Sequence, residues 1–132
     1  MRPDELYPII AVLSLLGVEF GGWALLGLIL GRKLDAERQR FFRAGHAHAG
    51  VLLVLSLVYF LYFDRADLSR TTQWVAGAIL VAGVSSQSGG FFLHLAAADL
   101  DQPSPGTWLT RTGALLIAAA LVILAVGLIR AA

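Results

Sequence analysis

The distribution of charge divides this chain into four long apolar stretches. No Asp, Glu, Lys or Arg occurs in 44–63, 71–98 or 112–129, and Glu19 is the only charged residue in 6–31. A helix crosses a bilayer with about 20 mostly apolar residues. The sequence therefore predicts an all-α protein whose four helices span a membrane over residues 7–31, 44–63, 72–98 and 109–130.

The connections between these stretches are short, which favours antiparallel neighbours and an up-down four-helix bundle. Charged residues make up 14% of the 132 residues, against about 25% in soluble domains. The whole chain, residues 1–132, is therefore expected to form one integral-membrane domain. There is no cysteine, which excludes disulfides and thiolate metal sites, and nothing resembles a nucleic-acid-binding surface.

The first connection, 32–43, carries five basic residues, namely Arg32, Lys33, Arg38, Arg40 and Arg43. The positive-inside rule places this connection in the cytoplasm. Both termini are then expected outside, and the bacterial inner membrane is the predicted location. The leader before the first stretch is acidic rather than basic and no clear cleavage site follows, so this stretch is expected to remain as a span.

Three histidines lie within the apolar stretches, and ionisable groups inside a membrane are usually functional. His48 and His94 are each expected roughly 6 Å from the cytoplasmic edge, with His46 slightly shallower. Imidazole binds copper, zinc and iron, and haem iron takes axial histidine. The sequence thus predicts haem b or a copper or zinc ion held by His48 and His94 with help from His46, or by all three. Two residues turn a helix by about 200°, so His46 and His48 should not face one site from a regular helix.

The third stretch brings several special residues onto one helical face, because Gly83, Gln87, Gly90 and His94 recur at spacings of four, three and four. Gly90 is expected to leave room for a cofactor. Gln87 and Glu19 fall near the midplane, and with Ser86 they are expected to form a polar core. A charged carboxylate at that depth costs about 2.5–3.5 kcal/mol, so Glu19 should be protonated, paired or functional.

The motif Arg43-Ala44-Gly45-His46-Ala47-His48-Ala49-Gly50-Val51-Leu52 resembles one found in uncharacterised bacterial four-helix integral membrane proteins. That resemblance implies the membrane fold and no activity. The segment is more loosely similar to the Arg-x-x-His-x-His opening of a helix in small membrane proteins related to haem–copper oxidase subunits. This second resemblance implies haem or copper at His46 and His48, but the full ligand set of that group is missing, so it does not imply oxygen reduction.

Other functions fit the same residues. A single glutamate in the first helix resembles small multidrug-resistance transporters, which implies that Glu19 alternates between a proton and a cation, although the motif around it differs. The segment from Arg40 to His46 faintly resembles glutathione-using membrane trimers. A non-catalytic accessory subunit is a further alternative. Small residues four apart, such as Gly17 and Gly21, favour close helix contacts, and a homo-oligomer or a membrane complex is expected.

Overall fold

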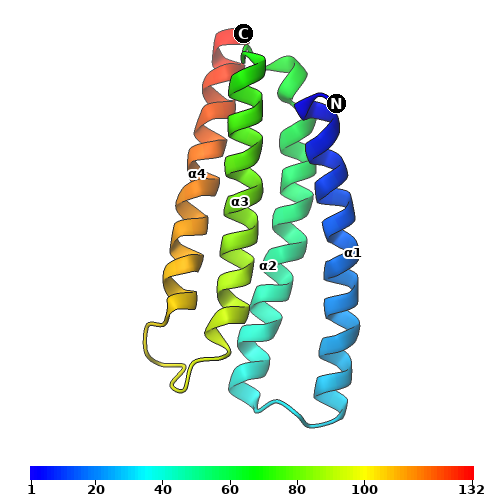
Figure 1. Ribbon diagram of the computed structural model, residues 1–132, viewed down its shortest axis with the longest axis vertical. Helices are drawn as coiled ribbons and strands as arrows, with labels where there is room; N and C mark the ends of the chain where they lie inside the picture. The colour runs from blue at the N-terminus through cyan, green and yellow to red at the C-terminus, as the bar shows by residue number, and fades with distance from the viewer.

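The computed structural model describes residues 1–132 and consists of four long helices and one short turn of helix. These elements are α1 (Pro3–Leu30), α2 (Ala36–Leu61), the 3₁₀ turn η1 (Phe63–Arg65), α3 (Arg70–His94) and α4 (Pro105–Ala131). All four α-helices are long and apolar enough to cross a bilayer. Successive helices run antiparallel, and both termini lie at the same end (Figure 1). The predicted all-α, up-down arrangement of four membrane-spanning helices is confirmed.

Hydrogen-bonding caps fix where three of the helices begin. Asp35, Ser69 and Ser104 accept bonds from backbone amides in the first turns of α2, α3 and α4, which satisfies donors that a helix start leaves free. Several helix ends differ from the predicted span limits, since α1 begins at Pro3 rather than at 7 and α4 at Pro105 rather than at 109. α2 begins at Ala36 rather than near 44, because the basic connection continues the helix, and α3 ends at His94 rather than at 98.

The helices form an open row rather than a closed square. In the view of Figure 1 the order is α4, α3, α2 and α1. The α3–α4 pair has the most extensive contact, α2 packs on both α1 and α3, and α1 touches α3 only sparsely. α1 and α4 are therefore the two edge helices of the row, and α1 is the less covered of the two.

The end of the bundle that carries the termini is held by a cluster of aromatic side chains. Tyr7 stacks on Phe60 at 5.4 Å between ring centroids and meets the edge of Trp74 at 5.5 Å. The Tyr7 hydroxyl donates to the Trp74 carbonyl at 2.7 Å, and the Tyr59 hydroxyl donates to the Ala120 carbonyl at 2.8 Å. These contacts tie α1 to α3 and α2 to α4 at one end.

Glycines bring α3 and α4 into backbone contact. A Cβ at Gly90 would collide with Thr110 Oγ1 and the Gly106 carbonyl, and a Cβ at Gly113 would collide with the backbone of Gln87. Small residues are the means by which helices approach closely in a membrane. The α3–α4 pair is thus a rigid hairpin against which α2 and α1 are placed.

At the opposite end, Arg38 joins the start of α2 to the end of α3. Its guanidinium donates to Asp35 at 2.6 Å and to the carbonyls of Leu95 and Ala97 at 3.4 Å. A cation at the C-terminal end of a helix is stabilised by the partial negative charge of the free carbonyls. This contact holds the α1–α2 connection close to the end of α3.

Candidate ligand-binding cleft

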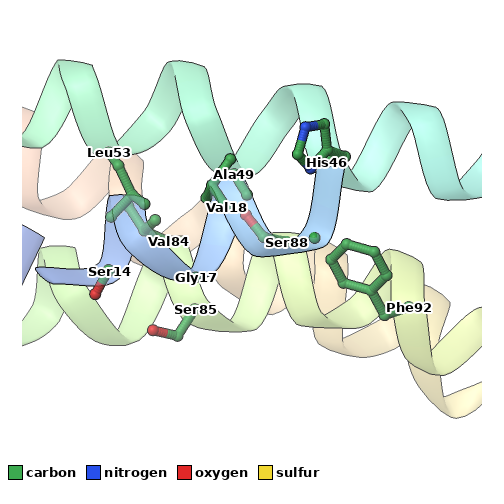
Figure 2. Close-up of a pocket in the computed structure, with 11 residues that line it drawn as sticks. Ser14, Gly17, Val18, His46, Ala49, Leu53, Val84, Ser85, Ser88 and Phe92 are labelled. Carbon is green, nitrogen blue, oxygen red and sulfur yellow. The ribbon is translucent and has the colours of Figure 1, made fainter. Parts of the chain in front are cut away.

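A cleft of about 250 Å³ lies where α1, α2 and α3 meet. The residues that line it include Gly17 of α1, His46 and Ala49 of α2, and Ser88 and Phe92 of α3 (Figure 2). Gly21 of α1 lines it as well. Gly17 and Phe92 are exposed, so the cleft reaches the surface of the helix row. That surface would face the acyl chains of a bilayer.

The glycines of α1 create this space and position His46. No atom lies within 4 Å of the point where a Cβ of Gly17 would stand. At Gly21 and Gly22 the nearest atoms to such a Cβ belong to the His46 ring, at 3.6 and 3.2 Å. Larger side chains on α1 would displace the imidazole, so this helix face and His46 depend on one another.

Two polar side chains in the cleft have unused hydrogen-bonding capacity. The Ser88 hydroxyl is buried and has no hydrogen-bond partner, and the residue as a whole is only 7% exposed. The histidine hydrogen bonds of this chain belong to His48 and His94, and neither ring nitrogen of His46 takes part in one. A neutral imidazole offers one donor and one acceptor. His46 therefore has a free donor and acceptor at the cleft, and the Ser88 hydroxyl next to the cleft has no partner within the chain.

His94 lies elsewhere and is fully engaged by the α3–α4 connection. Its Nδ1 is 2.7 Å from Ser104 Oγ and its Nε2 is 3.1 Å from the Leu100 carbonyl oxygen. The ring also meets the edge of Phe41 at 4.7 Å, and the residue is 7% exposed. Because the Leu100 carbonyl oxygen can only accept a hydrogen bond, Nε2 carries the proton, and Nδ1 accepts from the Ser104 hydroxyl. In this arrangement His94 ties the connection to the end of α3.

His48 occupies a third position, on the outside of α2. It is exposed, its Nδ1 donates to the Ala44 carbonyl at 3.0 Å, and its ring lies 5.0 Å from that of Phe91. His46 and His48 thus face different surroundings, as their two-residue spacing requires.

The three histidines do not form the ligand set expected from the sequence. No group of three or more His, Cys, Asp or Glu side chains that could hold a metal ion occurs among residues 1–132. For His94 to serve as an axial ligand, one ring nitrogen would have to give up a hydrogen bond inside the bundle. This donor set does not fit a shared haem or metal centre in the arrangement found.

The other expected site residues are also separated. The space beside Gly90 is filled by α4, so it is not open to a cofactor. Gln87 contributes its backbone to the contact with α4 and accepts from Thr110 Oγ1 at 3.3 Å through its carbonyl, and Ser86 is half-buried next to it. Glu19 is exposed on α1, and no hydrogen bond joins Glu19 to Gln87. Glu19 is not brought together with Gln87 and Ser86, because it lies two residues from both Gly17 and Gly21, which turns it by about 200° from the cleft.

Sequence reasoning assigned Gly17 and Phe92 no place in a site. Gly17 carried a signal, since it is one of two glycines four residues apart, but that spacing indicates close packing as readily as a cleft. Phe92 carried none, because an aromatic residue in an apolar helix is ordinary. Comparisons with protein-family models, with curated proteins and with solved structures give no match, so the cleft is interpreted from its own geometry alone.

Proposed function

We propose that this protein binds a small lipid-soluble molecule with a carbonyl or hydroxyl headgroup, of the chemical class of quinones, in the cleft between α1, α2 and α3. The observation that carries the proposal is the Ser88 hydroxyl, which is buried without a partner in a residue that lines the same cleft as His46. A buried polar group left unpaired costs about 1–3 kcal/mol. A ligand oxygen that reached it would remove that penalty.

The chemistry of the cleft matches such a headgroup. A carbonyl oxygen accepts hydrogen bonds from a hydroxyl or an imidazole N–H, while a quinol hydroxyl donates to an imidazole nitrogen. Phe92 supplies an aromatic edge at the mouth, and glycines keep one wall flat. His46 and Ser88 can therefore serve oxidised and reduced forms of one headgroup by changing the direction of their hydrogen bonds.

The size and location of the cleft set a limit on what lies inside it. At about 250 Å³ it is below the roughly 300–1,000 Å³ typical of pockets that enclose a whole drug-sized ligand. A headgroup fits inside while an apolar tail extends through the mouth between α1 and α3 into the acyl chains. Such a ligand would enter sideways from the membrane.

Thermal unfolding of the protein in lipid nanodiscs, with decylubiquinone as the probe, tests this proposal. A ligand at 100 times its Kd stabilises the folded state by about 2.7 kcal/mol, so a rise in Tm is expected. Ser88→Ala removes one hydrogen bond, which is worth about 0.5–1.5 kcal/mol, and should weaken binding roughly threefold to tenfold. Gly17→Leu fills the cleft and should abolish the shift in Tm.

His46 and His48 provide the matched pair of variants. His46→Ala should reduce the decylubiquinone-dependent shift, and His48→Ala should keep it, because only His46 lines the cleft. An unchanged Tm of the unsubstituted protein at saturating probe contradicts the proposal, as does an equal loss in both histidine variants.

Haem, copper or zinc bound through His46, His48 and His94 remains a prediction, and the same preparation addresses it. An absorption spectrum with a Soret band that is lost in His94→Ala supports haem, and stoichiometric copper or zinc without that band supports a bare ion. Either result would replace the proposed headgroup site. Transport through Glu19 has a separate readout, cation uptake into vesicles that disappears in Glu19→Gln.

A further inference from the structure

The outer face of α1 carries an uncovered row of side chains with alternating spacings of three and four residues. We name it the α1 seam, and it consists of Ile9, Val12, Leu16, Glu19, Trp23, Leu26 and Leu30. All seven are exposed, with Leu16 64%, Trp23 71% and Leu30 75% exposed. This spacing is the a/d pattern by which two helices pack side by side with a slight left-handed crossing.

Glu19 distinguishes the α1 seam from an ordinary lipid-facing surface. It lies near the middle of α1 and forms no ion pair, since the salt bridges of the chain involve only Arg2 and Arg38 as cations. It makes no hydrogen bond within the chain either. A charged carboxylate exposed to lipid at this depth costs about 2.5–3.5 kcal/mol or more, and a partner that hydrogen-bonds the protonated carboxyl would stabilise this helix face.

The outer face of α4 supplies the internal comparison. Trp108, Leu115, Val122 and Ile129 are exposed along it, and no charged residue lies between Arg111 and Arg130. Such an uncharged surface is stable against lipid acyl chains without a protein partner. The two outer faces therefore differ in one respect that matters, the carboxyl group in the middle of α1.

We propose that the α1 seam binds the α1 seam of a second copy of this chain, with the two Glu19 side chains meeting across the contact. Copies inserted in one membrane with the same orientation place their α1 helices parallel, so that each seam position meets its own equivalent. No Lys or Arg lies within the apolar stretches 6–31, 44–63, 71–98 and 112–129, which include the middle of each helix. The complementary group that a copy offers at this depth is thus Glu19 itself, and a protonated carboxyl both donates and accepts.

Two further features favour a copy as the occupant. The chain already uses the same spacing within itself, because Gly83, Gln87, Gly90 and His94 of α3 form its contact with α4. A single polar residue in such a seam fixes the register and the number of helices that associate. Glu19 is the single polar residue of the α1 seam. α1 also lies at one edge of the row (Figure 1), so a copy meets no obstruction, and the cleft with His46 lies on the other side of α1.

Cysteine cross-linking of the full chain in nanodiscs tests the contact, and the absence of native cysteine makes every single-cysteine variant unambiguous. Leu16→Cys and Leu26→Cys should give a covalent dimer of this chain under mild oxidation. Leu13→Cys, which lies on α1 beside the seam, and Leu115→Cys, on the outer face of α4, are the matched controls and should give at least fivefold less. All four positions are exposed, so none of these substitutions is expected to disturb folding.

Substitution of Glu19 in the Leu16→Cys background then tests the central residue. Glu19→Gln keeps a donor and an acceptor and should retain cross-linking. Glu19→Leu removes both, and because hydrogen bonds between membrane helices are worth about 0.6–1.7 kcal/mol, association should weaken roughly threefold to tenfold. Equal cross-linking at seam and control positions, a monomer at every protein-to-lipid ratio, or association unchanged in Glu19→Leu would overturn the proposal. His46→Ala leaves the seam intact, so its dimer should persist whether or not the cleft binds a ligand.

Discussion

The α3–α4 pair and the edge helix α1 use glycine in opposite ways. At Gly90 and Gly113 an added Cβ would collide with the backbone of the facing helix, whereas at Gly17 and Gly27 no atom lies within 4 Å of it. Gly90 and Gly113 thus allow close backbone contact between two helices. Gly17 and Gly27 leave open space, the first at the cleft and the second at a lipid-facing surface. Glycine spacing therefore indicates that a helix face is flat, but only the neighbouring helix decides whether that face is filled.

The histidines repeat this contrast. His94, next to the tight α3–α4 pair, has both ring nitrogens within hydrogen-bond distance of groups in the connection. His46, beside the loosely packed α1, has neither nitrogen engaged within the chain and lines a cleft. Tight packing leaves a polar side chain no freedom to bind anything else, so the loosely packed side of this molecule is where a ligand has access.

The largest expected difference in stability is between two glycine-to-alanine substitutions. In one the added Cβ meets the backbone of a facing helix, and in the other it meets open space. Gly113→Ala forces a Cβ against backbone atoms of α3, which cannot move like a side chain, and should lower the free energy of unfolding by about 1–3 kcal/mol. Gly17→Ala meets open space and should be neutral or raise it by up to about 1 kcal/mol. Unfolding in mixed micelles with increasing SDS measures both. Equal destabilisation by the two substitutions would remove the distinction between the two regions.

Removal of the two histidines outside the cleft should give the next largest difference. His94→Ala leaves the Leu100 carbonyl and the Ser104 hydroxyl without their partner and should destabilise the protein by about 1–3 kcal/mol. His48→Ala changes an exposed side chain and should stay within about 0.5 kcal/mol. The same SDS titration measures this pair, and a His94→Ala protein as stable as the parent would mean that the α3–α4 connection is held by other contacts.

The sequence was sufficient to predict the fold, but it was not sufficient to predict how each helix is rotated about its own axis. Long charge-free stretches determine four spans because the bilayer leaves few alternatives for apolar segments of that length. Which face of α1 turns inward depends on contacts with α2 and α3, so Glu19 was expected in the core and lies outside. Gly90 and His94 do share one face, but that face packs against Gly106, Thr110 and Gly113 of α4, a run of small residues that the sequence analysis did not use.

Two hydroxyl groups give a smaller test of the same comparison. Tyr59→Phe removes the hydrogen bond to Ala120 that ties α2 to α4, and it should cost about 0.5–1.5 kcal/mol. Ser88→Ala removes a hydroxyl that has no partner in the chain and should not lower stability in the absence of ligand. Thermal unfolding without added probe separates the two variants. A loss of stability in Ser88→Ala would show that the hydroxyl already has a partner.

The smallest expected effect lies at the connection between α1 and α2, where Asp35 accepts from the backbone amide of Arg38 and from its guanidinium. These contacts, the backbone bond foremost, hold the pKa of the Asp35 carboxyl below its ordinary value of 3.8. A depressed pKa in the folded state means that the stabilisation is fully present above the unfolded pKa and is lost as the pH falls through the folded value. Asp35→Asn keeps a capping side chain but cannot titrate. Its Tm should therefore fall less than that of the parent between pH 5 and pH 3, and parallel declines would mean that Arg38 holds the end of α3 without help from the Asp35 charge.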